Sequence, residues 1–298
     1  MAVPVVARTI HRHVLVDGVR VFYRASIPRD PDAAPVMVLL HGFPSASHQF
    51  RRLIDALGAD YRLIAPDYPG MGHSDAPLST SEGGSFTYTF DGLADVMDAF
   101  LERLGVARFV LYVFDWGAPV GFRLATRHPD RIAGLVVQNG NAYLEGLSDS
   151  ALEFVTLPPE DPGTDAAIRS LLTLDATRSQ YETGAGDREA IAPDGWTLDQ
   201  HLLDRPGRTQ PMLDLAHDYR SNLGRYPHWQ AWMRRHTPPT LILWGRNDAF
   251  FPAPGGQAYL RDLPDAELHL LDTGHFALEE KLPDVAPLIA DFLDRTWA

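Results

Sequence analysis

Asp115 is the residue of this 298-residue sequence whose type and position most clearly suggest chemistry. It follows the apolar run Phe109 to Phe114 and precedes Trp116-Gly117, a pattern typical of a strand that turns sharply into a helix. Such a turn exposes one side chain beyond the sheet edge, beside the positive end of the helix. An ionised carboxylate there can attack an electrophilic carbon without a base. The alternative is that Asp115 only caps the helix, a common role for aspartate.

His275 and Asp248 are the two residues that we expect to complete this chemistry. His275 follows the predicted strand Glu267 to Leu271, so its ring can lean over the sheet edge toward Asp115. An imidazole in that place can act as the general base that activates water to hydrolyse an ester formed on the carboxylate. Asp248 follows the predicted strand Thr240 to Trp244. It would hold the imidazole in its working tautomer, unless it is only a turn carboxylate.

Alternating strands and helices are predicted to position these residues. An Asp17-Gly18 pair between β-rich runs predicts an opening hairpin. Apolar runs then alternate with segments of helical spacing, which predicts an α/β fold with a mostly parallel sheet. The predicted strands are His13 to Asp17, Arg20 to Tyr23, Val36 to Leu40, Arg62 to Ala65, Phe109 to Phe114, Ile132 to Val137, Thr240 to Trp244 and Glu267 to Leu271. The predicted helices are Phe90 to Leu104, Trp116 to Arg127, Gly256 to Leu263 and Asp284 to Trp297.

The alternation stops between about residues 143 and 237, where helical pieces are separated by prolines. This segment keeps a globular composition with several aromatic residues, which argues against a disordered linker. We therefore expect a main α/β domain formed by residues 1–142 and 238–298, with residues 143–237 inserted as a helical cap.

Five motifs in order resemble the aspartate-nucleophile branch of the α/β-hydrolase superfamily, which includes epoxide hydrolases and haloalkane dehalogenases. The motifs are His41-Gly42-Phe43-Pro44, Asp67 to Ser74, Asp115-Trp116-Gly117, Trp244-Gly245-Arg246-Asn247-Asp248 and Gly274-His275-Phe276. The resemblance covers nearly the whole chain and implies that the backbone N–H groups of Phe43 and Trp116 form an oxyanion hole. Val113 departs from the pattern, because a glycine usually stands there and lets strand and helix approach closely.

The resemblance also implies a second place for the supporting acid. Some dehalogenases carry it after the strand that corresponds to Ile132 to Val137, where this sequence has Asn139 and Asn141. An asparagine side chain cannot serve as an anion, so Asp248 is favoured as the acid.

Tyr219 is the residue that suggests an epoxide as the substrate. The segment Asp218 to Asn222 resembles the epoxide-hydrolase cap segment in which a tyrosine protonates the ring oxygen. The alternative is a packed cap tyrosine without a catalytic role. Such enzymes commonly use a second cap tyrosine, which the segment Phe154 to Thr164 does not contain. Only their proximity in the chain suggests Tyr143 or Tyr181 as a substitute.

A carbon–halogen bond is the alternative target of the same three residues. Trp116 offers one indole N–H to a halide, and a cap tryptophan offers a second; the candidates are Trp196, Trp229 and Trp232. An asparagine often follows His-Gly in dehalogenases, where this chain has Phe43. A third possibility is a protein that keeps the fold and binds a ligand without turnover.

The expected pocket is apolar and aromatic, which suits a small apolar organic substrate. Its expected lining comprises Phe43, Phe114, Trp116, Tyr143, Trp229, Phe251 and Phe276.

The composition of the chain excludes several other classes of function. With 26 basic and 39 acidic residues, the net charge of −13 opposes binding to nucleic acid or anionic membranes. The chain has no cysteine, no metal-ligand spacing among its histidines and no nucleotide-binding glycine motif, so we expect no metal and no other cofactor. No signal peptide or membrane span is predicted, which makes a cytoplasmic location the default expectation. The sequence does not indicate an oligomeric state.

Overall fold

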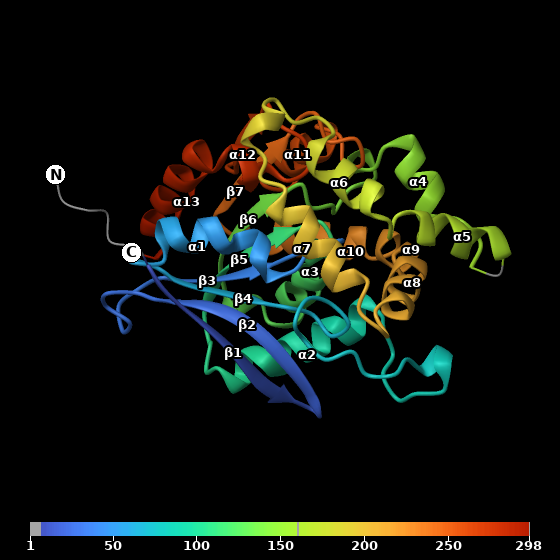
Figure 1. Cartoon of the computed structure of the whole chain (residues 1–298). Helices are drawn as coiled ribbons and strands as arrows, with labels where there is room; N and C mark the ends of the chain where they lie inside the picture. Colours follow the sequence, from blue (N-terminus) through green and yellow to red (C-terminus); the bar gives the residue numbers. More distant parts are fainter. Residues whose placement is uncertain (1–6, 160, 298) are drawn as a thin grey trace.

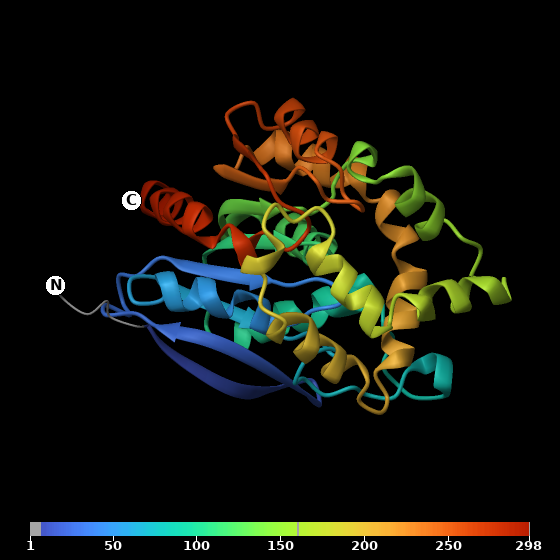
Figure 2. The same cartoon turned by 45° about the horizontal axis from the view of Figure 1, so that its top comes forward.

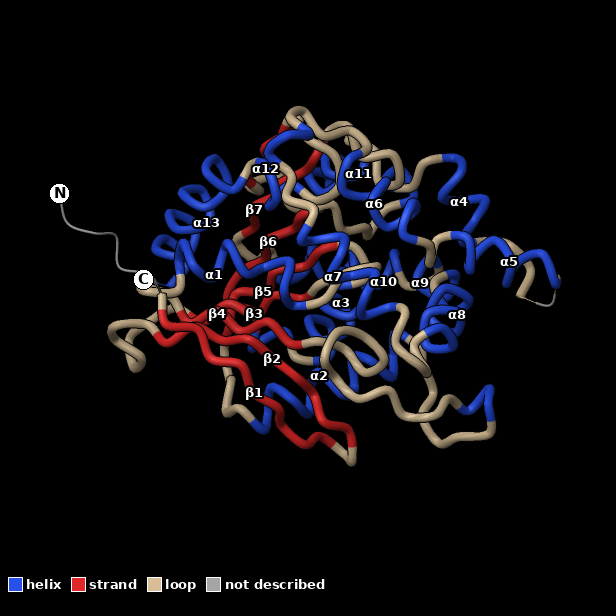
Figure 3. The backbone as a smooth tube through the Cα atoms, in the orientation of Figure 1, coloured by secondary structure: helices blue, strands red, loops and turns tan. Residues whose placement is uncertain are grey.

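The computed structural model describes residues 7–159 and 161–297 and is built around one eight-stranded sheet, shown in Figures 1 and 3. The order of the strands across the sheet is β1-β2-β4-β3-β5-β6-β7-β8. The strands are β1 Arg8–Val16, β2 Val19–Ile27, β3 Val36–Leu40, β4 Arg62–Pro66, β5 Phe109–Phe114, β6 Ile132–Gln138, β7 Thr240–Gly245 and β8 Glu267–Leu271. The predicted strands are all present, and the hairpin strands are longer than expected.

The hairpin formed by β1 and β2 explains the single antiparallel strand in the sheet. Asp17 and Gly18 both have positive φ, 48° and 88°, as the two central residues of a type I′ turn require. Strand β2 is antiparallel to both β1 and β4, whereas all other neighbouring strands pair in parallel. The expected α/β fold with a mostly parallel sheet is confirmed.

Helices cover both faces of the sheet and form one apolar core on each (Figure 1). Helices α2 Phe90–Arg103 and α3 Gly117–Arg127 pack on one face, and α1 Arg51–Leu57, α12 Ala277–Glu280 and α13 Leu282–Trp297 pack on the other. Helix α1 was not predicted, because seven residues give too short a periodic pattern. The expected helix Gly256 to Leu263 is instead α11 Pro254–Ala258 followed by a 3-10 turn, Tyr259–Arg261.

Between β6 and β7 the described residues form helices and turns, without a strand. These helices are α4 Asp149–Val155, α5 Pro162–Ser170, α6 Leu174–Glu182, α7 Asp194–Leu203, α8 Thr209–Asp218, α9 Arg220–Leu223 and α10 Tyr226–His236. Figure 2, like Figure 1, shows most of them on the side of the molecule opposite α13. This arrangement supports our proposal that residues 143–237 are a cap on the main domain.

The order of the strands determines where a site can form. After β3 the chain adds β4 on one side of that strand, and it then returns to add β5 on the other side. In open α/β sheets, ligands bind in the crevice that such a reversal opens at the carboxyl ends of the strands. Here the reversal lies between the ends of β3 and β5, which carry Phe43 and Asp115.

Candidate active site

Asp115 stands at a strained turn between β5 and α3. Its φ is 48°, a left-handed conformation that few residues other than glycine adopt. Gly117 makes the turn possible, because a Cβ at this position would collide with the carbonyl oxygen of Leu40. The geometry agrees with a nucleophile elbow, in which strain is accepted so that one side chain projects over the sheet edge.

The unexpected Val113 is accommodated by a glycine on the helix instead of on the strand. A Cβ added to Gly121 in α3 would lie 2.5 Å from Cγ1 of Val113 and 3.2 Å from Cδ2 of Leu111. Val113 itself is completely buried. The close approach of strand and helix is therefore preserved, and Val113 is compatible with a nucleophile elbow at Asp115.

The carboxyl group of Asp115 accepts hydrogen bonds from two backbone N–H groups. The N–H of Phe43 donates a hydrogen bond to Oδ1 at 2.6 Å, and the backbone N–H of Trp116 donates a second bond to the carboxyl group. Gly42 gives the carboxyl room, since a Cβ there would overlap Oδ1. The other oxygen, Oδ2, lies 3.8 Å from Nε2 of His275. These two N–H groups are the predicted oxyanion hole, and Oδ2 is left available for reaction.

His275 is oriented by Asp248. Its Nδ1 lies 2.6 Å from Oδ2 of Asp248, which fixes the proton on Nδ1 and directs Nε2 toward Asp115. Asn139 donates from Nδ2 to the same Oδ2 at 2.8 Å. Asn139, one of the two positions that we considered for the acid, therefore helps to hold Asp248, the expected acid, in place. Asn139 has a positive φ of 39°.

The surroundings of the two reactive groups shift their pKa values in a direction that suits catalysis. Burial raises the pKa of Asp115 to about 6, although His275 and the two backbone N–H groups oppose this rise. Burial lowers the pKa of His275, but the carboxylates of Asp248 and Asp115 outweigh burial, and the result is a raised pKa. Two groups with such shifts in one cavity are typical of active sites.

A cavity of about 240 Å³ opens above these groups, between the sheet and the helices α4, α5, α6 and α8. It is smaller than the ~300–1,000 Å³ of typical ligand pockets, which favours a small substrate. Six predicted site residues line it, namely Phe43, Asp115, Trp116, Tyr219, Phe251 and His275. The remaining lining was not predicted and comprises Leu147, Ser150, Ala151, Phe154, Val155, Ile168, Leu171, Leu172, Gln180, Met212, Ala216 and Phe250.

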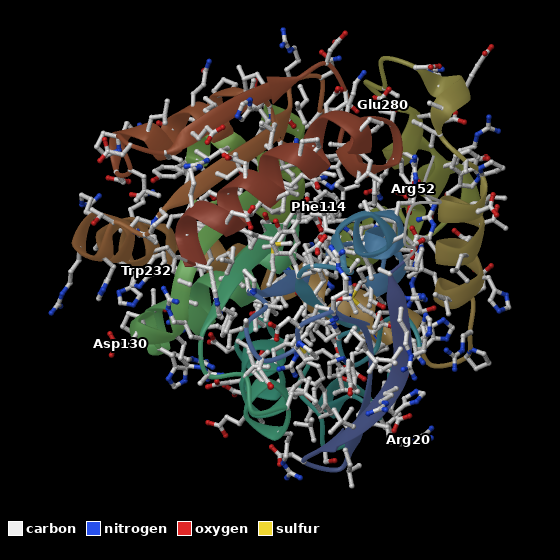
Figure 4. The ribbon with its side chains drawn as sticks, turned by 90° about the vertical axis from the view of Figure 1, so that its left-hand side faces the viewer. Arg20, Arg52, Phe114, Asp130, Trp232 and Glu280 are labelled. Carbon is white, nitrogen blue, oxygen red and sulfur yellow. The ribbon has the colours of Figure 1, made fainter. Side chains whose placement is uncertain are left out.

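Two aromatic residues expected in the lining lie instead beneath the imidazole. The ring centroid of Phe114 is 4.5 Å from that of His275, and the centroid of Phe276 is 5.3 Å from it. Figure 4 shows Phe114 near the centre of the molecule, among the packed side chains of the interior. The expectation is corrected: these rings support the histidine and do not line the cavity.

The other two expected pocket residues are used elsewhere. Tyr143 donates its hydroxyl to Asp262 Oδ2 at 2.7 Å. Trp229 stacks on Phe122 at a centroid distance of 5.3 Å. Neither lines the cavity, so the expectation is corrected for them too, because both aromatic side chains pack between helices of the core.

Tyr219 lies at the end of α8, and its ring packs edge-on against Phe90 at 5.7 Å. It lines the same cavity as Asp115. Its pKa is raised well above the usual value, mainly because the hydroxyl is buried and also because Tyr226 and Asp115 lie nearby. Tyr219 is therefore protonated at neutral pH and can donate. Tyr181 does not line the cavity and donates its hydroxyl to Asp199 at 2.5 Å. It is not placed to act as a second donor.

The described part of the chain contains no group of three or more His, Cys, Asp or Glu side chains arranged to hold a metal ion. Among the helices of residues 7–159 and 161–297, none has the length and apolar character needed to cross a membrane.

Sequence comparison relates the chain to known hydrolases. It is 38% identical to an uncharacterized hydrolase of Saccharomyces cerevisiae, over 95% of this chain and 96% of that protein. It is 30% identical to a cis-3-alkyl-4-alkyloxetan-2-one decarboxylase of Xanthomonas campestris, covering 89% and 90% of the two chains. It is 27% identical to epoxide hydrolase 3 of Xenopus tropicalis, covering 93% and 75%.

Structural comparison gives the same fold. The haloalkane dehalogenase DbeA of Bradyrhizobium elkani superimposes with a TM-score of 0.79 at 21% identity, covering 97% of this chain and 99% of that chain. The family model for the alpha/beta hydrolase fold matches residues 35–282. The chain is therefore a hydrolase that belongs to the alpha/beta hydrolase fold family.

Proposed function

We propose that this hydrolase opens a small, largely apolar epoxide to a vicinal diol through an ester on Asp115. The observation that carries the proposal is the presence of Tyr219 in the same cavity as Asp115. Opening an epoxide releases an alkoxide that needs a proton, and a tyrosine hydroxyl supplies one. The relative named epoxide hydrolase 3 supports this choice.

In the first step Oδ2 of Asp115 attacks a ring carbon. Oδ1 is held by the N–H of Phe43, so Oδ2 is the oxygen free to form the new C–O bond. The bond between that carbon and the ring oxygen breaks, and the electron pair left on the oxygen takes the proton of Tyr219. The product is a hydroxyalkyl ester of Asp115.

In the second step His275 activates water. Forming the ester removes the negative charge of Asp115, and this lowers the pKa of His275, which that charge helps to raise. The neutral imidazole accepts a proton from water as the water attacks the ester carbonyl carbon of Asp115, and Asp248 stabilises the imidazolium. The bond from that carbon to the alkyl oxygen then breaks, and the alkyl oxygen takes the proton of the imidazolium, so that the diol leaves. The proton of the re-formed Asp115 carboxyl group passes to the Tyr219 phenolate. The N–H groups of Phe43 and Trp116 stabilise the oxyanion on Oδ1.

Release of halide by the same residues is the second candidate, because Trp116 also lines the cavity. A halide site needs a further N–H donor, and none of the cap residues Trp196, Trp229 and Trp232 lines the cavity. Tyr219 therefore favours the epoxide over the halide. The relative from Xanthomonas campestris acts on an oxetan-2-one by name, another strained cyclic oxygen compound, and this ring belongs in the substrate panel.

The mass of a trapped ester distinguishes these reactions. We expect His275→Gln to form the ester and to hydrolyse it slowly. An epoxide adds its entire mass to the protein, whereas a haloalkane adds its mass less that of hydrogen halide. Peptide mapping should place the adduct on Asp115, and Asp115→Asn should form none.

Product analysis with the wild-type protein completes the test. Diols formed by wild type and not by Asp115→Asn support the proposal. Halide release without diol would make the protein a dehalogenase, and carbon dioxide release from the oxetan-2-one alone would make it a decarboxylase. A wild-type protein that behaves like Asp115→Asn throughout would show a ligand-binding role or a different substrate.

A further inference from the structure

Gln180 of α6 is a buried amide in the wall of a mostly apolar cavity. The residue lines the cavity and is only 7% exposed. No hydrogen bond joins this amide to any other residue that the structure describes. The neighbouring Gln200 shows the contrast, since it accepts from Thr177 at 2.8 Å and donates to the carbonyl of Leu172 at 3.0 Å. Gln180 is therefore the cap glutamine whose hydrogen-bonding capacity remains available to a ligand.

The backbone that carries Gln180 is held firmly in place. The ring of the next residue, Tyr181, stacks on Phe276 with a centroid distance of 3.9 Å and an angle of 6°. The Tyr181 hydroxyl donates to Asp199, whose other carboxylate oxygen lies 3.0 Å from Nε2 of His48 in the main domain. Helix α6 is thus anchored to the main domain beside the cavity. The backbone that holds Gln180 at the cavity wall therefore has a fixed position.

Gln180 and Tyr219 approach the cavity from different flanks. Gln180 lies in α6, next to Tyr181, which stacks on Phe276 beside His275. Tyr219 packs on Phe90, which packs edge-on against Trp116 at 5.7 Å. A substrate whose epoxide oxygen meets Tyr219 can therefore place a different atom against Gln180.

The side-chain amide of Gln180 affects which ligands bind in the cavity with a favourable free energy. A hydrocarbon ligand would displace water from Gln180 and leave a buried donor and acceptor unpaired, which is costly. A site built to form a hydrogen bond rejects analogues that lack the partner atom. An ether or carbonyl oxygen satisfies the amide N–H and loses less hydration than a hydroxyl or charged group.

We propose that Gln180 is a specificity-determining residue that donates a hydrogen bond to an ether or carbonyl oxygen of the substrate, separate from the epoxide oxygen. The preferred substrate class is accordingly an oxygenated epoxide, such as a glycidyl ether, and not a plain alkene oxide. This inference rests on the proposed epoxide hydrolysis.

The test compares matched epoxides in which one methylene group is replaced by oxygen at successive positions, beginning with 1,2-epoxyhexane and ethyl glycidyl ether. For wild type, at least one oxygenated member should have a kcat/KM about tenfold or more above that of its hydrocarbon partner. Gln180→Leu should abolish or reverse this ratio, mainly through KM, and Gln180→Asn should retain part of it. Gln257→Leu, which alters an exposed glutamine, should leave the ratio unchanged. A ratio that is unaffected by Gln180→Leu, or an equal loss on both partners, would overturn the inference.

Binding without turnover separates this inference from the proposed function. If wild type hydrolyses no epoxide, the epoxide-hydrolase proposal fails, and binding of tetrahydropyran and cyclohexane can be compared by calorimetry. Tighter binding of the ether by wild type, lost in Gln180→Leu, would support recognition of oxygen by Gln180. Equal binding of the two rings would show that the amide does not select ligands.

Discussion

Asp115→Asn should make the protein more stable while removing turnover. The pKa of the buried carboxyl is raised from 3.8 to about 6, so ionising it in the folded protein is less favourable than in the unfolded chain. The difference corresponds to about 3 kcal/mol. Asparagine carries no charge, retains an oxygen for the N–H of Phe43 and tolerates a φ of 48° better than most residues. The catalytic carboxylate is thus expected to cost the fold stability.

The size of the effect should depend on pH in a defined direction. Because the folded pKa of Asp115 lies above the unfolded value, the folded state binds more protons between these values, and wild-type stability falls as pH rises through this range. Above about pH 6 the full cost is present. At pH 8 the gain from Asp115→Asn should approach about 3 kcal/mol, and at pH 5 it should be roughly half of this.

Thermal unfolding followed by circular dichroism at pH 8 and pH 5 provides the assay. With ~2 °C per kcal/mol for a chain of this size, Tm of Asp115→Asn should exceed that of wild type by about 6 °C at pH 8. Asp265→Asn, at an exposed position, controls for the removal of a charge. A variant no more stable than wild type at pH 8, or a gain that does not change with pH, would refute the reasoning.

The remaining predictions concern the same site and its support. Because attack requires an ionised Asp115, kcat/KM should fall about tenfold per pH unit below about pH 6, as a pH profile would show. Asp248→Asn should slow ester hydrolysis by roughly 10³-fold or more, with the ester accumulating in intact-mass spectra. Tyr219→Phe should lower the single-turnover rate of epoxide opening by roughly 10²- to 10⁴-fold, without a comparable effect on any haloalkane reaction. Gly121→Ala should cost about 1–3 kcal/mol in chemical denaturation, and Val113→Ala in the same chain should restore part of it, since the two side chains then fit together.

Much of the main domain could be predicted, because its signals are local in the sequence. Buried parallel strands are short apolar runs, and Asp17-Gly18 encodes its own turn. The motifs place Asp115 and His275 at strand ends, and parallel strands bring their carboxyl ends to one edge. The structure brings these residues within reach of one another as expected.

The cavity wall could not be predicted, because it depends on how the cap helices pack. Phe154 and Gln180 have no local signal that distinguishes them from other helix residues, and only tertiary contacts direct them inward. Phe114 illustrates a different error. It adjoins Asp115 in the sequence, but side chains alternate along a strand, so it points beneath the imidazole. Proximity in the chain was a poor guide to the lining.

The two aspartates of the site differ in their hydrogen bonding, and this difference assigns their proposed roles. Asp248 accepts bonds from Asn139 and from the N–H groups of Phe250 and Phe251, in addition to its contact with His275. Both of its oxygens are thus occupied, and it serves to orient and stabilise. Asp115 accepts from the backbone N–H groups of Phe43 and Trp116, and its Oδ2 lies 3.8 Å from Nε2 of His275, which is too far for a hydrogen bond. Incomplete solvation of a buried carboxylate raises its pKa and leaves lone pairs free to react. A side chain that donated to Oδ2 of Asp115 would stabilise the anion, and it would thereby make the nucleophile less reactive.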